Sequence, residues 1–355
     1  MRVTIRDVAQ RAGVSKATVS YVLNGHGTMM RIPEETKQRV LAVVNEMGYH
    51  PNALARSLAQ KRTHTVAVVL QFPRVFSGWS GFTNEMMRGA TDAAIRLGYD
   101  LLLHTRQLEP EDEPAMEADA LLAAEVATLT DGRVDGALLL RDVEDRLAGA
   151  LREQRFPAVL MFTRSEQPDL WFVDCDNILG GMLATEHLIS LGHRRIVHLS
   201  GSPRSGAARD RLAGFRKALQ NAGIPERPEW IVESTYPGAD FTPATTLFDA
   251  PAAERPTAIF AWSDDVAIRI MGVLRQKGLH APEDVAIVGF DSSPMCDHTD
   301  PPLTSVRQPI YDMAVQAFTL LTERIAEHTV AQTQVLVPPE LVVRRSCGAR
   351  RTSQH

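Results

Sequence analysis

The chain has 355 residues, of which 44% are hydrophobic and 23% charged, with a formal net charge of -5 at pH 7. This ordinary globular composition excludes a low-complexity chain and allows two or three domains. The three cysteines form no CxxC pair, no apolar run approaches the roughly 20 residues that span a bilayer, and MRVTIRDVAQ lacks the apolar core of a signal peptide. We therefore expect a cytoplasmic protein without a disulfide framework, a metal site or a membrane span.

The charge is unevenly distributed along the sequence. Residues 1–62 hold ten Lys or Arg and four acidic residues, a net charge of +6, whereas residues 63–355 carry -11. A basic head on an acidic body suits a head that binds a polyanion and a body that is repelled by it. Solvated charged faces explain the same asymmetry equally well.

Three short helices are expected in the head. The stretch TIRD from Thr4 matches a capping box, Gly13 ends that helix, Ser15 caps a second helix that runs to about Leu23, and Pro33 fits the first turn of a third. Their periodicity predicts buried faces made of Val8, Ala9, Ala12, Val19, Val22, Leu23, Val40, Val43, Val44 and Met47.

The second helix leaves Lys16, Ala17, Ser20 and Tyr21 outside, which is typical of a helix-turn-helix unit whose second helix enters the major groove. The alternative is a generic three-helix bundle. After Pro51, residues 52–60 predict a two-turn helix too short to persist alone, which we expect to order on DNA or in a dimer. Without that context the segment also fits a linker.

The body alternates apolar strands with helices. Helices are expected around 82–97 and 115–129, and the strands are VAVVL (66–70), YDLLLH (99–104), GALLL (136–140), AVLMF (158–162), RIVHLS (195–200), WIVES (230–234), AIFAW (258–262) and VAIVGF (285–290). Continuous apolar strands separated by helices indicate parallel sheets covered on both faces, and two such series imply two Rossmann-like lobes.

Ligands of open α/β sheets bind beyond the carboxyl ends of the strands. That rule selects Phe72, Phe76, Trp79, Arg164, Ser263, Asp264 and Asp291. Asp264 fits the cap of a helix as well as a ligand contact. Trp79 fits the core or an interface as well as a stacking platform.

Motifs of catalysis are missing from the sequence. It contains no GxSxG, HExxH, Walker-type GxxxxGK[ST] or strand-following GxGxxG, so we expect neither an enzyme nor a cofactor. DCDN (174–177) lacks the glycine and distal glutamate of a calcium loop, and CDHTD (296–300) has no second ligand cluster, so we read both as ordinary loops.

Several motifs in one order resemble the lactose-repressor (LacI/GalR) family of bacterial transcription regulators. They are TIRDVAQRAGVSKATVSYVLN, IPEETKQRVLAVVNEMGYHPNALARSLAQKRTHTVAVV, TEHLISLGHRRIVHLSG, DRLAGFRKAL, FAWSDDVA, VAIVGFD and PPLTSVRQP. The resemblance covers essentially the whole chain. It implies a helix-turn-helix domain (1–50), a hinge helix or linker (51–63) and a two-lobed effector-binding and dimerisation domain of periplasmic-binding-protein type (64–345), with a cleft between the lobes and a tail (346–355).

The resemblance also implies residue roles. Lys16 and Ala17 are expected to contact bases, Leu58 to wedge into the minor groove, and the DNA contacts to comprise Thr4, Ser15, Lys16, Ala17, Thr18, Ser20, Tyr21, Asn24, Asn52, Ala55 and Leu58. Tyr21 stands where many members have Arg, which puts the operator half-site at that position in doubt. The effector contacts are expected to be Phe76, Trp79, Arg164, Arg211, Phe241, Trp262, Ser263, Asp264, Asp291 and Gln308, with the pair Arg211 and Asp291 as hydroxyl donor and acceptor. Arg211 as a solvated helix charge and Trp262 as a packing residue are the alternatives.

The lobes are expected to divide at 64–163 with 308–334 and at 164–307 with 335–345. The tail VVRRSCGARRTSQH has no leucine heptads, so a homodimer is expected rather than a tetramer. We expect a repressor that binds a pseudopalindromic operator and is released by a sugar effector. The alternative is a regulator with a purine or other small metabolite as corepressor. A free sugar-binding protein would lack the helix-turn-helix, and an enzyme on these lobes would need a catalytic constellation.

Overall fold

The computed structural model describes residues 3–23, 30–50, 57, 62–70, 81–104, 115–141, 146–234 and 240–349. The chain divides into two compact units, residues 1–64 and 65–355. Within the described residues, no helix is long and apolar enough to cross a membrane.

The first unit holds three helices, α1 (Ile5–Ala12), α2 (Lys16–Leu23) and α3 (Glu34–Glu46). Gly13 ends α1 in the left-handed conformation with φ 66°, which a residue without a Cβ adopts at least cost. The predicted faces meet in one core, in which Val8, Val19 and Val40 are completely buried. Arg39 of α3 donates from Nε to the carbonyl of Ala12 at 3.1 Å and so ties α3 to the last turn of α1.

The second unit contains two six-stranded sheets, which we call lobe 1 and lobe 2. Lobe 1 has the strand order β11-β5-β4-β3-β1-β2, all pairs parallel, and lobe 2 has β12-β10-β9-β8-β6-β7, parallel except for β10 with β12. The lobe 1 strands are β1 (Thr65–Leu70), β2 (Asp100–His104), β3 (Gly136–Leu140), β4 (Ala158–Met161), β5 (Trp171–Cys175) and β11 (Gln334–Val337). The lobe 2 strands are β6 (Ile196–Ser200), β7 (Ile231–Glu233), β8 (Ala258–Ala261), β9 (Ala286–Asp291), β10 (Thr304–Arg307) and β12 (Glu340–Val342).

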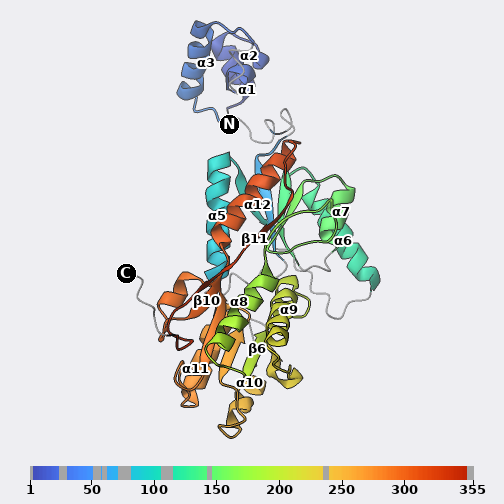
Figure 1. Ribbon diagram of the computed structural model, residues 1–355. Coiled ribbons are helices and arrows are strands. Elements are labelled where there is room, and N and C mark those ends of the chain that lie inside the picture. The colour runs from blue at the N-terminus through green and yellow to red at the C-terminus, as the bar shows by residue number, and fades with distance from the viewer. Residues whose placement is uncertain are drawn as a thin grey trace. The chain divides into compact units, whose positions relative to one another are not determined.

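Helices accompany both sheets (Figure 1). They are α5 (Gly81–Leu97), α6 (Ala115–Leu129), α7 (Leu147–Glu153) and α12 (Ile310–Ile325) in lobe 1, and α8 (Asn177–Ser190), α9 (Gly206–Asn221), α10 (Thr242–Thr246) and α11 (Asp264–Gln276) in lobe 2. Short 3-10 turns span Pro228–Trp230, Leu247–Asp249 and Pro294–Asp297. The sheets carry the hydrophobic cores, whose strand residues are almost fully buried.

The chain crosses between the lobes three times: after β5, after β10 into α12, and between β11 and β12. This corrects the expected division at residue 163, because β5 pairs with β4 and β11 and therefore belongs to lobe 1. It also corrects the placement of residues 335–345, because β11 lies in lobe 1 and only β12 in lobe 2. The physical reason is that each strand has an apolar run of only three residues, WFV in β5 and VLV in β11, which is too short to mark a strand or its sheet from the sequence.

Two helix pairs pack with their backbones in close contact. In lobe 2, a Cβ on Gly181 of α8 would overlap the carbonyl oxygen of Arg211 in α9, and one on Gly214 of α9 would overlap that of Ile178. In lobe 1, a Cβ on Gly89 of α5 would overlap the carbonyl oxygen of Tyr311 in α12. The glycines of α8 and α9 therefore fix where α9 carries Arg211.

Candidate DNA interface and effector site

The start of α2 is held by local hydrogen bonds. The Ser15 hydroxyl accepts the backbone N–H of Thr18 at 3.1 Å and lies 2.9 Å from the Thr18 hydroxyl. This capping leaves Lys16 and Ala17 exposed in the first turn, whereas Val19 is completely buried. The first turn of α2 therefore offers one cation and one small side chain to a partner, in the manner of a helix that contacts base edges.

Tyr21 and Ser20 lie further along α2. The Tyr21 ring is 37% exposed, and Ser20 is half-buried. Tyr21 thus remains available to a partner as a hydroxyl and a ring face. Thr4 is exposed, and both its N–H and its hydroxyl donate to the Asp7 carboxylate at 2.8 and 2.7 Å. These bonds hold the pKa of Asp7 below its ordinary value.

Several expected contact residues lie outside the residues that the structure describes. These are Asn24, Asn52, Ala55 and Leu58 among the DNA contacts and Phe72, Phe76 and Trp79 among the strand-end and effector residues. The expected hinge helix at 52–60 lies outside them too, apart from Ser57.

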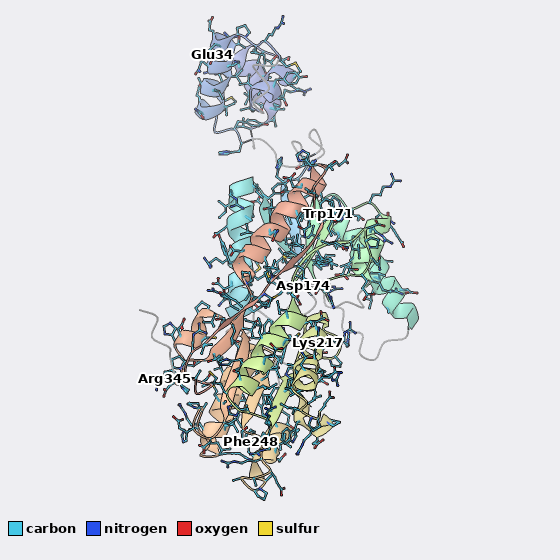
Figure 2. The ribbon with its side chains drawn as sticks, in the orientation of Figure 1. Glu34, Trp171, Asp174, Lys217, Phe248 and Arg345 are labelled. Carbon is cyan, nitrogen blue, oxygen red and sulfur yellow. The ribbon has the colours of Figure 1, made fainter. Side chains whose placement is uncertain are left out.

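A connected set of polar side chains lies where the two lobes join, and we call it the interlobe cluster: Asp174, Asn177, Arg211, Trp262, Asp291 and Gln308. Asp174 is the last residue but one of β5 in lobe 1 and lies shortly before the chain passes into α8 (Figure 2). Asn177 begins α8, Arg211 projects from α9, Trp262 follows β8 and Asp291 ends β9. The carboxyl ends of three strands from both sheets therefore meet here, as the strand-end rule requires.

Arg211 is the centre of the cluster and is only 4% exposed. Its Nε donates to Asn177 Oδ1 at 2.8 Å, and its Nη1 donates to the Trp262 carbonyl at 2.5 Å. The guanidinium carbon lies 3.6 Å from the centre of the Phe290 ring. These contacts exclude the reading of Arg211 as a solvated helix charge. Burial lowers the pKa of Arg211, and Asp291 opposes that effect.

Asp291 faces Arg211 without a direct hydrogen bond, since its Oδ1 lies 3.9 Å from Arg211 Nη1. The same oxygen accepts Gln308 Nε2 at 2.6 Å. Asp291 and Ser292 both have positive φ, 110° and 49°, a strained backbone of the kind that concentrates at functional sites. Burial raises the pKa of Asp291 well above its ordinary value, and the nearby Arg211 only partly offsets this.

Asp174 adds a second buried carboxyl to the cluster. Its Oδ1 accepts the Cys175 N–H at 2.8 Å and lies 3.4 Å from Asn177 Nδ2. Burial raises the pKa of Asp174 to about 7, against the lowering effects of the Cys175 hydrogen bond and the Arg211 charge. The cluster therefore holds two carboxyl groups and one guanidinium, and two of the donor nitrogens of that guanidinium are already engaged by Asn177 and Trp262. It is rich in hydrogen-bond acceptors.

Asp264 makes internal hydrogen bonds with both of its carboxylate oxygens. Oδ1 accepts the Ser305 hydroxyl at 2.6 Å, while Oδ2 accepts the Ser293 N–H at 2.7 Å and the Cys296 thiol at 3.1 Å. Its pKa is raised to about 6 by burial, and the three donors lower it. Ser263 is the N-cap of α11, with its hydroxyl accepting the Val266 N–H at 3.4 Å. The geometry thus gives both residues an anchoring role.

Three further expected effector residues, of which Trp262 belongs to the cluster, lie in different settings. Trp262 is half-buried, and its indole N–H donates to the Ser234 carbonyl at 3.0 Å. Arg164, after β4 of lobe 1, pairs with Asp210 of α9 in lobe 2 at 2.9 Å and lines a cavity of about 420 Å³. Phe241 is 8% exposed and packs in the core of lobe 2 with Ala244 and Phe248. We therefore assign Phe241 to the core.

Sequence reasoning missed Asp174, Asn177 and Phe290. The stretch DCDN has the look of a metal loop, but Asp174 lies one residue before the end of β5. The signal that would have found it is WFVDC, a short strand whose carboxyl end falls under the same rule that selected Asp291. Phe290 lies in VAIVGF, where nothing distinguishes a residue that stacks on an arginine from an ordinary core residue.

Comparison with protein families finds two matches. Residues 4–52 match the model of bacterial regulatory proteins of the lacI family, and residues 185–347 match the periplasmic binding protein-like domain. The first match covers the helix-turn-helix unit, and the second begins within α8 and covers most of lobe 2.

Similar curated proteins extend over the whole chain. The HTH-type transcriptional repressor PurR of Photobacterium profundum is 32% identical over 345 residues, covering 97% of this chain and 98% of that protein. The HTH-type transcriptional regulator DegA of Bacillus subtilis is 32% identical over 357 residues, covering 99% of this chain and 100% of that protein.

Two solved structures of transcriptional regulators are also similar to nearly the whole chain. The lac repressor dimer bound to operator and the anti-inducer ONPF has a TM-score of 0.81 at 26% identity, covering 98% of this chain and 100% of that one. A complex of the transcriptional regulator CelR with cellobiose has a TM-score of 0.65 at 31% identity, covering 97% and 100%. The expected helix-turn-helix head and two-lobed α/β body are confirmed.

Proposed function

This chain belongs to the LacI family of bacterial regulatory proteins, and we propose from that premise that its interlobe cluster is the effector site of a ligand-responsive transcriptional regulator. Family members are transcriptional regulators, so the chain is a DNA-binding regulator and not an enzyme.

Operator DNA contacts the head through the first turn of α2. Lys16 and Ala17 are exposed there, next to the cap made by Ser15 and Thr18. Tyr21 contributes a hydroxyl or a ring face where many family members present Arg. Leu58 supplies the minor-groove wedge, and two heads of a homodimer bind the half-sites of a pseudopalindromic operator.

One observation carries the assignment of the effector site: a buried guanidinium, Arg211, faces the Asp291 carboxyl 3.9 Å away, beyond hydrogen-bonding distance. A hydroxyl or N–H group of a ligand completes such a pair by donating to the carboxylate while the guanidinium donates to the ligand. Because the cluster is rich in acceptors, it favours a neutral ligand with several donors and disfavours an anion.

The effector that we favour is a purine base or another small metabolite that acts as corepressor. The similar curated proteins include repressors named PurR, among them that of Photobacterium profundum. A purine edge carries both N–H donors and ring acceptors, which match Asp291 and Arg211. The similarity to PurR repressors therefore supports a purine corepressor better than a sugar inducer.

A sugar effector is the second candidate, and one finding favours it. The CelR structure at 31% identity contains cellobiose. Sugar hydroxyls are donors too, and Asp291 and Asp174 suit them as acceptors. In that case the ligand releases operator DNA, whereas a corepressor strengthens its binding.

The experiment is operator binding, followed by fluorescence anisotropy, with neutral purines, mono- and disaccharides, and phosphorylated sugars added singly. Lys16→Ala loses about 1–3 kcal/mol of operator affinity and keeps ligand binding. Arg211→Ala keeps operator binding and loses the ligand response, as does the near-isosteric Asp291→Asn. Arg216→Ala is the matched control, because Arg216 lies on the same helix and pairs at the surface with Glu226.

The outcomes separate the parts of the proposal. The site is supported if a neutral purine or sugar changes operator affinity in the wild type and in Arg216→Ala but not in Arg211→Ala or Asp291→Asn. If both cluster variants respond normally, the effector binds elsewhere. A response to phosphorylated sugars alone contradicts the acceptor-rich site. The direction of the change in operator affinity distinguishes corepressor from inducer.

A further inference from the structure

Lobe 2 contains a second cavity, of about 440 Å³, at the opposite end of its sheet from the interlobe cluster. Its lining includes Ile196, the first residue of β6, and Trp230, the residue before β7. The cluster lies at the carboxyl ends of β8 and β9, which run parallel to β6. A strand of five residues separates the two ends by roughly 13 Å, so the cavity is not part of the effector site.

The floor of this cavity is apolar and preformed. Ile196, Phe215, Leu219 and Trp230 line it and are at most 7% exposed. These side chains come from β6, α9 and the turn before β7, so packed elements fix the floor from several sides. The volume falls in the range of roughly 300–1,000 Å³ that is typical of sites for small molecules.

The rim of the cavity is cationic. Arg194, Arg195 and Arg227 line it, and none of them pairs with a carboxylate of the described residues. Arg194 donates to the Ala222 carbonyl at 3.4 Å, Arg195 donates to the carbonyls of Arg255 and Ala252 at 2.7 and 3.3 Å, and Arg227 stacks on the Trp230 ring at 4.5 Å. Three guanidinium groups thus gather at the cavity with carbonyl and ring partners only.

The described acidic residues near the rim do not form ion pairs with Arg194, Arg195 or Arg227. Glu226 is bound by Arg216, with Nε–Oε distances of 3.0 and 3.2 Å, and Asp284 lies 3.8 Å from Arg255. Glu229 and Glu254 are exposed and form no ion pair with the three arginines. Guanidinium groups are the donors that suit carboxylate and phosphate best, because their forked geometry matches two anionic oxygens.

We propose that this cavity is a second ligand site, which takes a small organic anion with a flat apolar body and a carboxylate or phosphate head. The body lies on the apolar floor, and the head meets the fork of Arg227 or Arg194. The site differs from the interlobe cluster in charge preference, since the cluster favours neutral donors. It stands independently of the proposed effector function.

The second site is joined to the cluster by one helix. Phe215 and Leu219 follow Arg211 on α9 by one and two turns, roughly 6 and 12 Å along the axis. The cavity and the cluster therefore contact the same helix at positions one to two turns apart.

Saturation-transfer NMR on the full chain tests the site directly. The probes are benzoate, phenyl phosphate and the neutral isostere benzamide, at concentrations up to about 10 mM, which detects affinities in the millimolar range. We expect saturation of benzoate or phenyl phosphate but not of benzamide, and the stronger of the two identifies the preferred head. At least one of Arg194→Ala and Arg227→Ala weakens anion binding about tenfold, the loss of one hydrogen bond to a charged group, and the variant that does so identifies the arginine that binds the head.

Two controls keep the outcome specific. Arg275→Ala removes an exposed arginine of the same lobe that donates to the Asp300 carbonyl, and it leaves anion binding unchanged. Asp291→Asn changes the interlobe cluster and still binds the anion, which separates this site from the effector site. The proposal is overturned if benzamide binds as well as benzoate, if neither rim variant weakens the anion, or if no anion is saturated at all.

Discussion

Because α8 and α9 are in close backbone contact, we predict that Gly214→Ala lowers both stability and effector affinity. A Cβ at this position would overlap the Ile178 carbonyl oxygen and lie 2.8 Å from the Met182 backbone nitrogen. Both neighbours are backbone atoms of α8, so no side chain can swing aside. The two helices must separate, and Arg211, which lies one turn before Gly214, must move with α9.

The magnitude follows from two opposed effects. Overpacking of this kind costs about 1–3 kcal/mol, and contact with backbone places Gly214→Ala at the upper end. Alanine in place of a helical glycine returns about 0.5–1 kcal/mol. The net loss is about 2 kcal/mol, which lowers the Tm by about 4–8 °C in a unit of this size. Effector affinity falls as well, because the guanidinium is displaced.

Gly272→Ala is the matched control in the same lobe. Gly272 also lies inside a helix, α11, but a Cβ there would meet nothing within 4 Å. The substitution should therefore stabilise the chain by about 0.5–1 kcal/mol through helix propensity alone. The assay is thermal and urea unfolding followed by circular dichroism. If the two variants shift the Tm in the same direction, the packing argument is refuted.

Three further predictions concern single side chains. The pKa of Asp174 is raised to about 7 in the folded state, whereas the unfolded chain releases this proton near the ordinary value of 3.8. The free energy of unfolding therefore falls as pH rises between those two values. Asp174→Asn should reduce the slope of the unfolding free energy against pH by up to about 1.4 kcal/mol per pH unit, measured by urea titrations at pH 4.5–7.5. An unchanged slope would contradict the raised pKa. Asp264→Asn should lower the Tm, because an amide nitrogen replaces an acceptor for Ser293, Cys296 or Ser305. It should leave effector affinity within about threefold in calorimetry. A large loss of effector affinity with an unchanged Tm would instead make Asp264 a ligand contact. Leu58→Ala should weaken specific operator binding far more than nonspecific binding in salt-matched anisotropy, whereas equal losses would remove the wedge role.

Much of the fold follows from local pattern. The capping box at Thr4, the glycine at position 13 and the valines of three helical faces determine the head, since each satisfies a backbone or burial requirement within a few residues. Apolar runs likewise predict β1 and β9. Strands such as β5 and β11 escape that reasoning, because their burial depends on pairing with each other, and the partners are more than 150 residues apart.

The site is predictable only in part for the same reason. Strand ends select Asp291 and Asp264 alike, but the sequence does not distinguish a carboxylate that faces Arg211 from one that receives three internal donors. That distinction arises from the loop after β9, where Ser293 and Cys296 turn back toward α11. Phe241 packs in the core with Ala244 and Phe248, and its spacing of three and seven residues from them is the local signal that the assignment to the effector site overlooked.

If a ligand at the interlobe cluster controls operator binding, then operator DNA must change the affinity for that ligand in return. The measurement is the calorimetric Kd of the effector, once for the free protein and once for the operator complex. We expect the two Kd values to differ by at least about fivefold, the same factor by which the effector changes operator affinity, and we expect Asp291→Asn to abolish the difference. The same Kd in both states, for a ligand that binds the wild type, would contradict it.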